Sequence, residues 1–452
     1  MSNLKHSALA VTLAAVLAGC APHAQKQKDF ENALVNKFCS EEFFAQNEAK
    51  IQKNSDVIYT GINAGLIARG CSEYKRSNSF FDAAEESYKI DVDMENLAAK
   101  GARTVASTLV NDNVFDYGGT LYERIMVNTY KGLNYMSLND FENARVEFNR
   151  ALMRQDKAKE YFARQIEKNR AELDKSKKTA GEDGFNKSSD DIMGRYDDLF
   201  REFETTKDFV NPYATYMASV FFYMDRDYAK ASDLLREVAL INPKDAQLQA
   251  QYKLFEQRAR SMSSKKAKNH IFVAYEDGFG TIKEEFRFTL PLPVDGKLIT
   301  ATFAMPTLKK REASFGSLQV NKVKTSRVVD FDTVVATEFK LELPGVIAKA
   351  VASTITKTAL NAVVAKNDST GGLLALASSA LTTLATQADT RSWRGLPKTA
   401  SVVMLENNGK LDIHAANGEE LLSQSVNKGK NVLVVVRSYA PYYPTQISVI
   451  ER

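Results

Sequence analysis

The chain has 452 residues, and its 60 lysines and arginines nearly balance its 56 aspartates and glutamates, which leaves a formal net charge of +4. A charge this balanced argues against nucleic acid as a partner, and the length is sufficient for two or three domains with cores of their own. The composition therefore excludes a strongly basic nucleic-acid-binding chain and a single small domain.

An apolar run begins after Lys5 and His6 and ends at Leu17-Ala18-Gly19-Cys20. It has the length of a signal-peptide core and is too short to span a bilayer as a helix. Its last four residues resemble the bacterial lipobox, which implies cleavage before Cys20 and a lipid anchor of fatty acyl chains, such as palmitate, on that residue. Ala21 in the next position resembles lipoproteins of the outer membrane. The alternative is an ordinary secretory signal with an accidental cysteine.

The composition changes along the chain in a way that divides it into a secretion segment, a tether and two domains with a linker. The predicted segments are 1–19 (signal peptide), 20–30 (polar tether), 31–262 (helical repeat domain), 263–270 (linker) and 271–452 (β-rich domain).

Two further cysteines, Cys39 and Cys71, follow Cys20. In an oxidising periplasm an even pair indicates one disulfide, and a bridge over a loop of this size contributes roughly 3–4 kcal/mol. Two buried thiols on neighbouring helices are the alternative. A metal site is not expected, because no histidine has ligand spacing from either cysteine.

From Glu31 to Met262 apolar residues recur at helical spacing, and one stretch, "YKGLNYMSLNDFENARVEFNRAL", carries a repeat-like pattern. Gly132 and Tyr135 have the G-x2-Y spacing, and Ala144 and Phe148 have the A-x3-F spacing, of the tetratricopeptide helix pair. The stretch resembles one such repeat. Gly132 and Ala144 have small side chains that allow two antiparallel helices to approach closely, while the aromatic residues fill the groove beside them.

A second match, "NPYATYMASVFFYMDRDYAKASDLLREVALINP", places Phe222, Ala231 and Leu235 at the later positions of the same pattern. Asn128 and Lys131 depart from the residues expected at the start of the first match, so we expect that part of the helix to pack differently.

A third and weaker copy is "SFFDAAEESYKI", in which Phe81, Ala84 and Tyr88 have the spacing of the pattern residues in the second helix of the repeat. The spacings between copies are not multiples of 34 residues, so we predict a degenerate array with insertions. The alternative is an ordinary helical bundle with coincidental matches.

Strand patterns begin after the linker, with "IFVAYEDGFG", "KEEFRFTLPLP" and "KLITATFAMP", and return as "SVVML", "KLDIHA", "NVLVVVRSYA" and "TQISVI". We predict antiparallel strands in a sandwich-like domain, with a hairpin at Asn407-Asn408-Gly409 because Asn-Gly favours two-residue hairpin turns. The expected fold class is α+β, an all-α tetratricopeptide-like domain followed by this β-rich domain.

Residues 345–390 interrupt the strands with two alanine-rich segments, which predict an inserted helical hairpin packed on the sheet. Ser369 to Ala388 carry no charge but few strongly apolar side chains, so a membrane-spanning helix is not expected. Reversible membrane contact or self-association remains the alternative. Trp393 is predicted to be a packing anchor, with ligand stacking as its alternative role.

A search for catalytic motifs gives none: the sequence lacks G-x-S-x-G, a Walker loop, H-E-x-x-H and C-x-x-C. We therefore expect no catalytic, cofactor-binding or metal-binding residues and no cofactor, and the protein is not expected to be an enzyme. A hidden pair of carboxylates remains the one enzymatic alternative.

Three blocks, "YERIMVNTYKGLNYMSLNDFENARVEFNRA", "NPYATYMASVFFY" and "ADTRSWRGLP", resemble a group of outer-membrane lipoproteins with tetratricopeptide-like repeats. The resemblance implies a periplasm-facing, lipid-anchored adaptor that binds a protein of the cell envelope. The alternative is a structural or cell-wall glycan-binding lipoprotein that acts through the β-rich domain. Partners are thus the membrane and an envelope protein, with self-association left open.

Overall fold

The computed structural model describes residues 25–94, 117–158, 160–164, 167, 189–206, 208–260, 268–294, 297–366 and 388–452. Helices occupy the N-terminal part and β-sheets the C-terminal part, so the protein is of the mixed α+β class, as predicted. The signal segment and Cys20 lie outside the described residues.

The helices are α2 (Glu41–Gln52), α3 (Val57–Gly70), α4 (Tyr74–Met94), α6 (Leu121–Ser137), α7 (Phe141–Asp156), α10 (Asp197–Glu202), α11 (Pro212–Met224), α12 (Tyr228–Ile241), α13 (Ala246–Arg260) and α14 (Phe331–Lys366). The strands are β1 (His270–Asp277), β2 (Ile282–Val294), β3 (Lys297–Lys309), β4 (Leu318–Val320), β5 (Val323–Lys324), β6 (Ser326–Asp330), β7 (Thr399–Glu406), β8 (Lys410–Ala415), β9 (Glu420–Ser425), β10 (Val432–Ser438) and β11 (Gln446–Glu451).

The turns of three helix pairs, α3/α4, α6/α7 and α11/α12, share one backbone geometry. The middle residue of each turn, Ser72, Asn139 or Arg226, has a positive φ, at 61°, 58° and 65°. In each turn the following residue donates its N–H to the carbonyl five residues earlier, at 2.8–2.9 Å. This is how a helix ends when one left-handed residue satisfies its last carbonyls. The same local structure therefore occurs three times in the chain.

Aligning the pairs on these turns corrects the predicted phase of the weakest copy. Ser77, not Ala84, stands five residues after its turn residue, as Ala144 and Ala231 do after theirs. Phe81 then matches Phe148, and the turns lie 67 and 87 residues apart. The prediction was shifted by two helical turns because Ala84 and Tyr88 repeat the four-residue spacing of Ser77 and Phe81 seven residues later, on the same face of α4.

The central sheet has five strands in the order β11-β10-β1-β7-β6. β1 and β10 are parallel and the other pairs are antiparallel, so the prediction of purely antiparallel strands was wrong. All eight residues of β1 are buried, as expected for a central strand covered on both faces.

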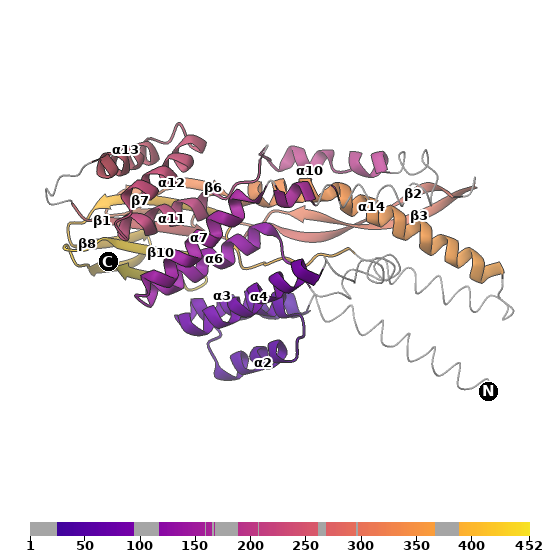
Figure 1. Cartoon of the computed structure of the whole chain (residues 1–452), viewed down its shortest axis with the longest axis horizontal. Helices are drawn as coiled ribbons and strands as arrows, with labels where there is room; N and C mark the ends of the chain where they lie inside the picture. Colours follow the sequence, from indigo (N-terminus) through magenta and orange to yellow (C-terminus); the bar gives the residue numbers. More distant parts are fainter. Residues whose placement is uncertain are drawn as a thin grey trace.

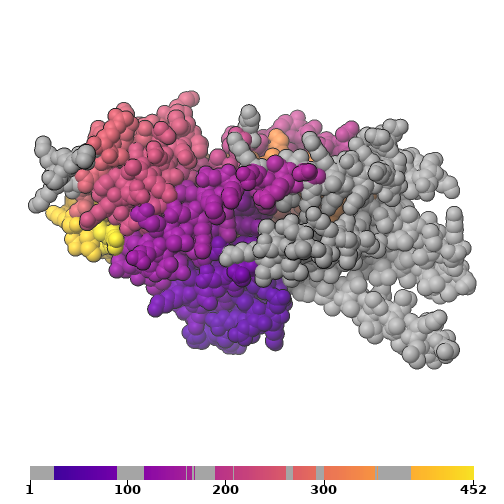
Figure 2. All heavy atoms as spheres, viewed as in Figure 1, coloured from indigo at the N-terminus to yellow at the C-terminus, as the bar shows by residue number. Residues whose placement is uncertain are grey.

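Helices cover one face of this sheet, and a second sheet covers the other. Phe272 and Ala274 of β1 and Leu433 of β10 belong to the same core as the helix pairs. Their neighbours Ile271 and Val273 point the other way, into a core shared with the four-stranded sheet β5-β4-β8-β9. Figure 1 shows α6, α7, α11 and α12 lying along the sheet, and Figure 2 shows the segments of the three helix pairs and α13 forming one continuous surface.

The predicted hairpin at Asn407-Asn408-Gly409 is wrong, although the turn itself exists. β7 pairs with β1 and β6, whereas β8 pairs with β4 and β9, so the turn carries the chain from one sheet to the other. The Asn407 side chain donates to the carbonyls of Asn427 and Lys430, both at 2.8 Å, which fixes the turn between the two sheets.

β2 and β3 form a long hairpin that packs on α14, and together they extend away from the rest of the molecule (Figure 1). We call these three elements the arm. Phe303 and Met305 of β3 share a core with Leu343 and Ile347 of α14. The helix begins at Phe331, earlier than the predicted boundary at 345, and the second half of the predicted helical hairpin lies outside the described residues except Ala388.

The N-terminal boundary of the folded part also differs from the prediction, which assigned 20–30 to a tether. Residues 25–35 are helical, and Phe30 is buried against Tyr59 and Phe43. A disulfide joins Cys39 to Cys71, with a Cα–Cα distance of 5.7 Å, and so ties the chain after this helix to the end of α3.

Candidate functional site

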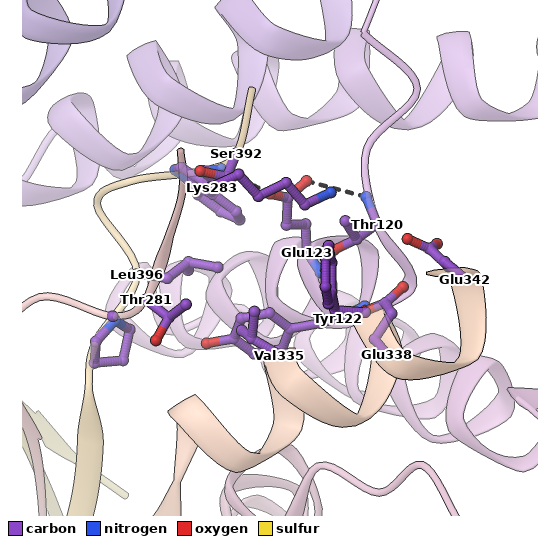
Figure 3. A pocket seen from close by; sticks show the side chains of 14 residues that line it. Thr120, Tyr122, Glu123, Thr281, Lys283, Val335, Glu338, Glu342, Ser392 and Leu396 are labelled. Carbon is purple, nitrogen blue, oxygen red and sulfur yellow. Dashed lines mark hydrogen bonds between the residues drawn. The ribbon is translucent and has the colours of Figure 1, made fainter. Parts of the chain in front are cut away.

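A small pocket lies where α6 begins, between α14, the start of β2 and the segment around Trp393 (Figure 3). Thr120 and Glu123 form a capping box at the first turn of α6, in which each side chain bonds the backbone of the other residue. The Glu123 carboxylate also accepts hydrogen bonds from the Tyr117 hydroxyl, at 2.6 and 2.8 Å, and from the backbone N–H of Trp393, at 2.6 Å.

A second carboxylate reaches the same helix end from the arm. Glu338 of α14 accepts the backbone N–H groups of Leu121 at 2.6 Å and Tyr122 at 3.0 Å. These donors have no partner within α6, and the positive end of the helix dipole favours a negative charge there. Glu338 thus attaches the base of the arm to the start of α6.

Burial dominates the electrostatics of the pocket. It raises the pKa of Glu123 above its usual range despite the hydrogen bond from Tyr117. Burial, together with the charge of Glu342, also raises the pKa of Glu338. Lys283 of β2 behaves differently: burial opposes its charge, but Glu342 and Asp389 outweigh burial and raise the lysine pKa. The pocket therefore holds several carboxylates and one nearby cation.

The pocket is too small for an organic substrate. Its volume is about 30 Å³, room for roughly two water molecules. Three of the residues that line it carry a buried donor that makes no hydrogen bond to described protein groups: the Tyr122 and Ser392 hydroxyls and the Trp393 Nε1. Because Glu123 and Glu338 already serve helix capping, we interpret the pocket as a polar joint between the arm and the helices. The sequence analysis missed this pocket; the capping-box pattern "TLYE" at residues 120–123 could have indicated the helix end at which it lies.

We expect Glu338→Gln to flatten the pH dependence of stability. A carboxyl whose pKa is raised in the folded state binds protons more tightly there, so stability is greatest below its unfolded pKa of about 4.5 and falls as the pH rises through the folded value. The loss is about 1.4 kcal/mol for each unit of pKa elevation. Thermal unfolding from pH 5 to pH 9 measures this loss. Glu204→Gln is the control, because Glu204 is exposed and does not line the pocket. An unchanged slope in Glu338→Gln would contradict the assignment.

The two residues that depart from the repeat pattern, Asn128 and Lys131, form a buried ion network. The Lys131 Nζ lies 2.6 Å from Glu85 and 2.9 Å from Glu147, and Lys131 is only 1% exposed. Asn128 donates to the same two carboxylates. Burial opposes ionisation of Glu85, but the charge of Lys131 outweighs it and lowers the glutamate pKa to about 2. The network joins α4, α6 and α7.

The predicted packing residues of the repeats lie between paired helices. A Cβ on Gly132 would stand 2.8 Å from the Phe148 ring, so the glycine is required for the α6–α7 contact. Phe148 stacks on Phe221 of α11 at 4.9 Å. The remaining predicted residues occupy the α6/α7 and α11/α12 pairs: Tyr135 is partly buried, and Ala144, Phe222, Ala231 and Leu235 are fully buried.

Trp393 is buried where the segment after the arm returns to the core. Its ring makes edge contacts with Phe81 and Tyr130, both at 5.9 Å between centroids. It therefore links two of the helix pairs, as a packing anchor would, and its buried Nε1 makes no hydrogen bond to described protein groups.

The first helices of the second and third pairs, α6 and α11, which we call the inner helices, are covered by the protein's own sheet, whereas their partners α7 and α12, the outer helices, are more exposed. All thirteen residues of α11 are buried. Tyr213 of α11 and Tyr130 of α6 both donate to the Glu276 carboxylate of β1, at 2.6 and 3.2 Å. The surface on which open helical repeat arrays hold their ligands is thus occupied within the chain.

Within the described residues, no cluster of three or more histidine, cysteine, aspartate or glutamate side chains could hold a metal ion. None of the described helices combines the length and the apolar character that crossing a bilayer requires. Comparison with protein-family models, with curated proteins and with solved structures gave no match.

Proposed function

We propose that the protein is a lipid-anchored scaffold of the bacterial cell envelope, with its anchor at Cys20 in the outer membrane and its body in the periplasm. The lipobox-like Leu17–Cys20 supports the anchor, and the Cys39–Cys71 disulfide fits an oxidising compartment. The observation that supports the scaffold role is the stack of three helix pairs whose turns share one backbone geometry, because stacked helix pairs build an extended surface.

We infer further that the three pairs are degenerate tetratricopeptide-like repeats. The turns agree in backbone geometry, and Gly65, Gly132 and Ser219 all stand seven residues before their turn residue. Gly65 lies against Phe81 as Gly132 lies against Phe148, so the first two pairs bring their helices together through the same glycine–phenylalanine contact.

A protein partner would have to use the outer helices, since the inner ones face the sheet. Val146 and Met153 are seven residues apart on α7 and 44% and 48% exposed, and Leu240 of α12 is 72% exposed. Large apolar side chains at such exposure, on one helix face, are typical of protein contact surfaces.

The lipid anchor is tested by Cys20→Ala in a chain that carries a conventional secretory signal. We expect this variant to move from the membrane fraction to the soluble periplasmic fraction, because several acyl chains are needed for stable attachment. Ala21→Ser is the control and should stay membrane-bound. Mass spectrometry of the N-terminal peptide supplies the second measurement: an unacylated Cys20 in membrane-bound wild-type protein would refute the anchor.

The scaffold role is tested by photo-crosslinking in cells from positions 146 and 240, with position 424 on exposed β9 as the control. We expect one discrete protein adduct from the α7 and α12 positions. Binding to purified peptidoglycan, with no adduct at either helix position, would instead support the glycan-binding alternative.

A further inference from the structure

The two outer helices, α7 and α12, run side by side in the same direction. Arg145 of α7 donates to Asp227, the N-cap residue of α12, at 3.1 Å, and about one turn later Lys230 of α12 donates to Asn149 of α7 at 2.5 Å. Residue numbers therefore increase together along both helices. Figure 2 shows the two segments adjoining on the molecular surface, so their boundary faces outward.

Three exposed apolar side chains are evenly spaced along this boundary. Val146 and Met153 of α7 are 44% and 48% exposed, and Ile241 of α12 is 48% exposed. The first two lie on the stripe of α7 that includes Asn149, and Ile241 lies on the stripe of α12 that includes Lys230, because residues three, four, seven or eleven positions apart share a helix face. Val146 and Met153 are separated by seven residues, or about 10.5 Å. The register set by the hydrogen bond between Lys230 and Asn149 places Ile241 a similar distance beyond Met153.

Two carboxylates lie between the second and third of these apolar side chains. Asp156 of α7 and Glu237 of α12 stand seven residues after Asn149 and Lys230, and so they lie opposite each other. Partial burial raises the pKa of Glu237, and the negative charge of Asp156 raises it further. Neither carboxylate forms an ion pair with a described residue. A cation placed between them would therefore be attracted by both. We call the three apolar side chains and these two carboxylates the α7–α12 surface.

The spacing of the apolar side chains matches an α-helix and not a β-strand. Seven residues of α-helix span about 10.5 Å, so apolar residues at heptad spacing on a partner helix would meet the three side chains in turn. Amphipathic helices bind apolar surfaces of other helices in this way. An extended strand covers the same distance in about three residues, whose side chains point to opposite faces, so it could not contact all three sites.

We propose that the α7–α12 surface binds an amphipathic helix of the envelope partner, with apolar residues at three successive heptad positions and a lysine or arginine between the second and third of them. The inference rests on the proposed scaffold function and specifies the surface and the kind of segment that this function uses. The basic residue of the partner helix would neutralise Asp156 and Glu237.

The geometry is tested with benzoylphenylalanine at position 146, 153 or 241 of the full chain in cells. We expect all three positions to crosslink to one segment of one other protein, and mass spectrometry of the adducts to place the attachment sites about seven residues apart, in the order of the three positions or its reverse. Attachment sites in an extended strand or in separate segments would overturn the helix but not the scaffold role. An adduct of two copies of this chain would also overturn the helix. The absence of any adduct would refute the scaffold role as well.

The charge of the partner helix is tested by Asp156→Lys combined with Glu237→Lys. Both residues are exposed, so we expect the variant to fold, which circular dichroism checks. The yield of the adduct from position 146 should fall on the order of tenfold, because like charges then face the basic residue of the partner. The control, Glu419→Lys combined with Glu420→Lys, makes the same charge change at exposed positions at the start of β9 and should leave the yield unchanged. Equal yields from the two folded variants would overturn the proposal.

Discussion

Lys131→Met is expected to lose about 3 kcal/mol of unfolding free energy, because it removes the one fully buried cation beside Glu85 and Glu147 and leaves these carboxylates only the more exposed Arg150 and Arg154. Methionine nearly preserves the volume, so the loss would be electrostatic. Urea unfolding followed by circular dichroism measures the change through the transition midpoint.

Two further variants make the expectation specific. Lys157→Met, at an exposed lysine just after α7, should change stability by less than about 0.5 kcal/mol. Adding Glu147→Gln to Lys131→Met should recover part of the loss, because one of the two buried carboxylates that shared the lysine is then neutral. A Lys131→Met protein as stable as wild type would show that the network contributes nothing net.

Phe148→Ala is expected to lose about 3–5 kcal/mol through the cavity it leaves. Phe148 is fully buried, fills the space beside Gly132 and stacks on Phe221 of the next helix pair, so its loss loosens both the α6–α7 contact and the α7–α11 contact. Differential scanning calorimetry measures the effect as a lower Tm.

Val146→Ala, at a partly exposed position on the same helix, is the control and should cost less than about 0.5 kcal/mol. Phe148→Leu should keep most of the stability because it retains most of the volume. Equal losses from Phe148→Ala and Val146→Ala would contradict the stacking of the helix pairs described here.

Local patterns predicted individual elements well and their partners poorly. The strand at "IFVAYEDGFG" was predicted from its β-branched and aromatic residues and is β1. Its parallel partner β10 stands more than 150 residues later, and no local signal specifies such a pairing. The Asn-Gly turn failed as a hairpin for the same reason: turn chemistry fixes a local bend, whereas tertiary contacts decide which sheets the flanking strands join.

The start of α14 and the pocket were missed for different reasons. Pro344-Gly345 looks like a break, but Pro344 lies inside the helix, which begins at Phe331. The pocket depends on Glu338 meeting α6 across more than 200 residues of sequence. The capping box at Thr120 and Glu123 could have indicated one half of it. Lys131 was noticed only as a departure from the repeat, because its three acidic partners come from two other helices.

The first helix of the folded chain packs on its neighbours α2 and α3 and also contacts residues far along the sequence. Glu31 bonds Arg394, 363 residues later, and also pairs with Arg311, while Gly395 fits against Leu34. Contacts of such long range form late, because the loop they close must first be ordered. During synthesis, the first helix can therefore pack on α2 and α3 early, but its contacts with Arg394 and Gly395 must wait until almost the entire polypeptide has emerged.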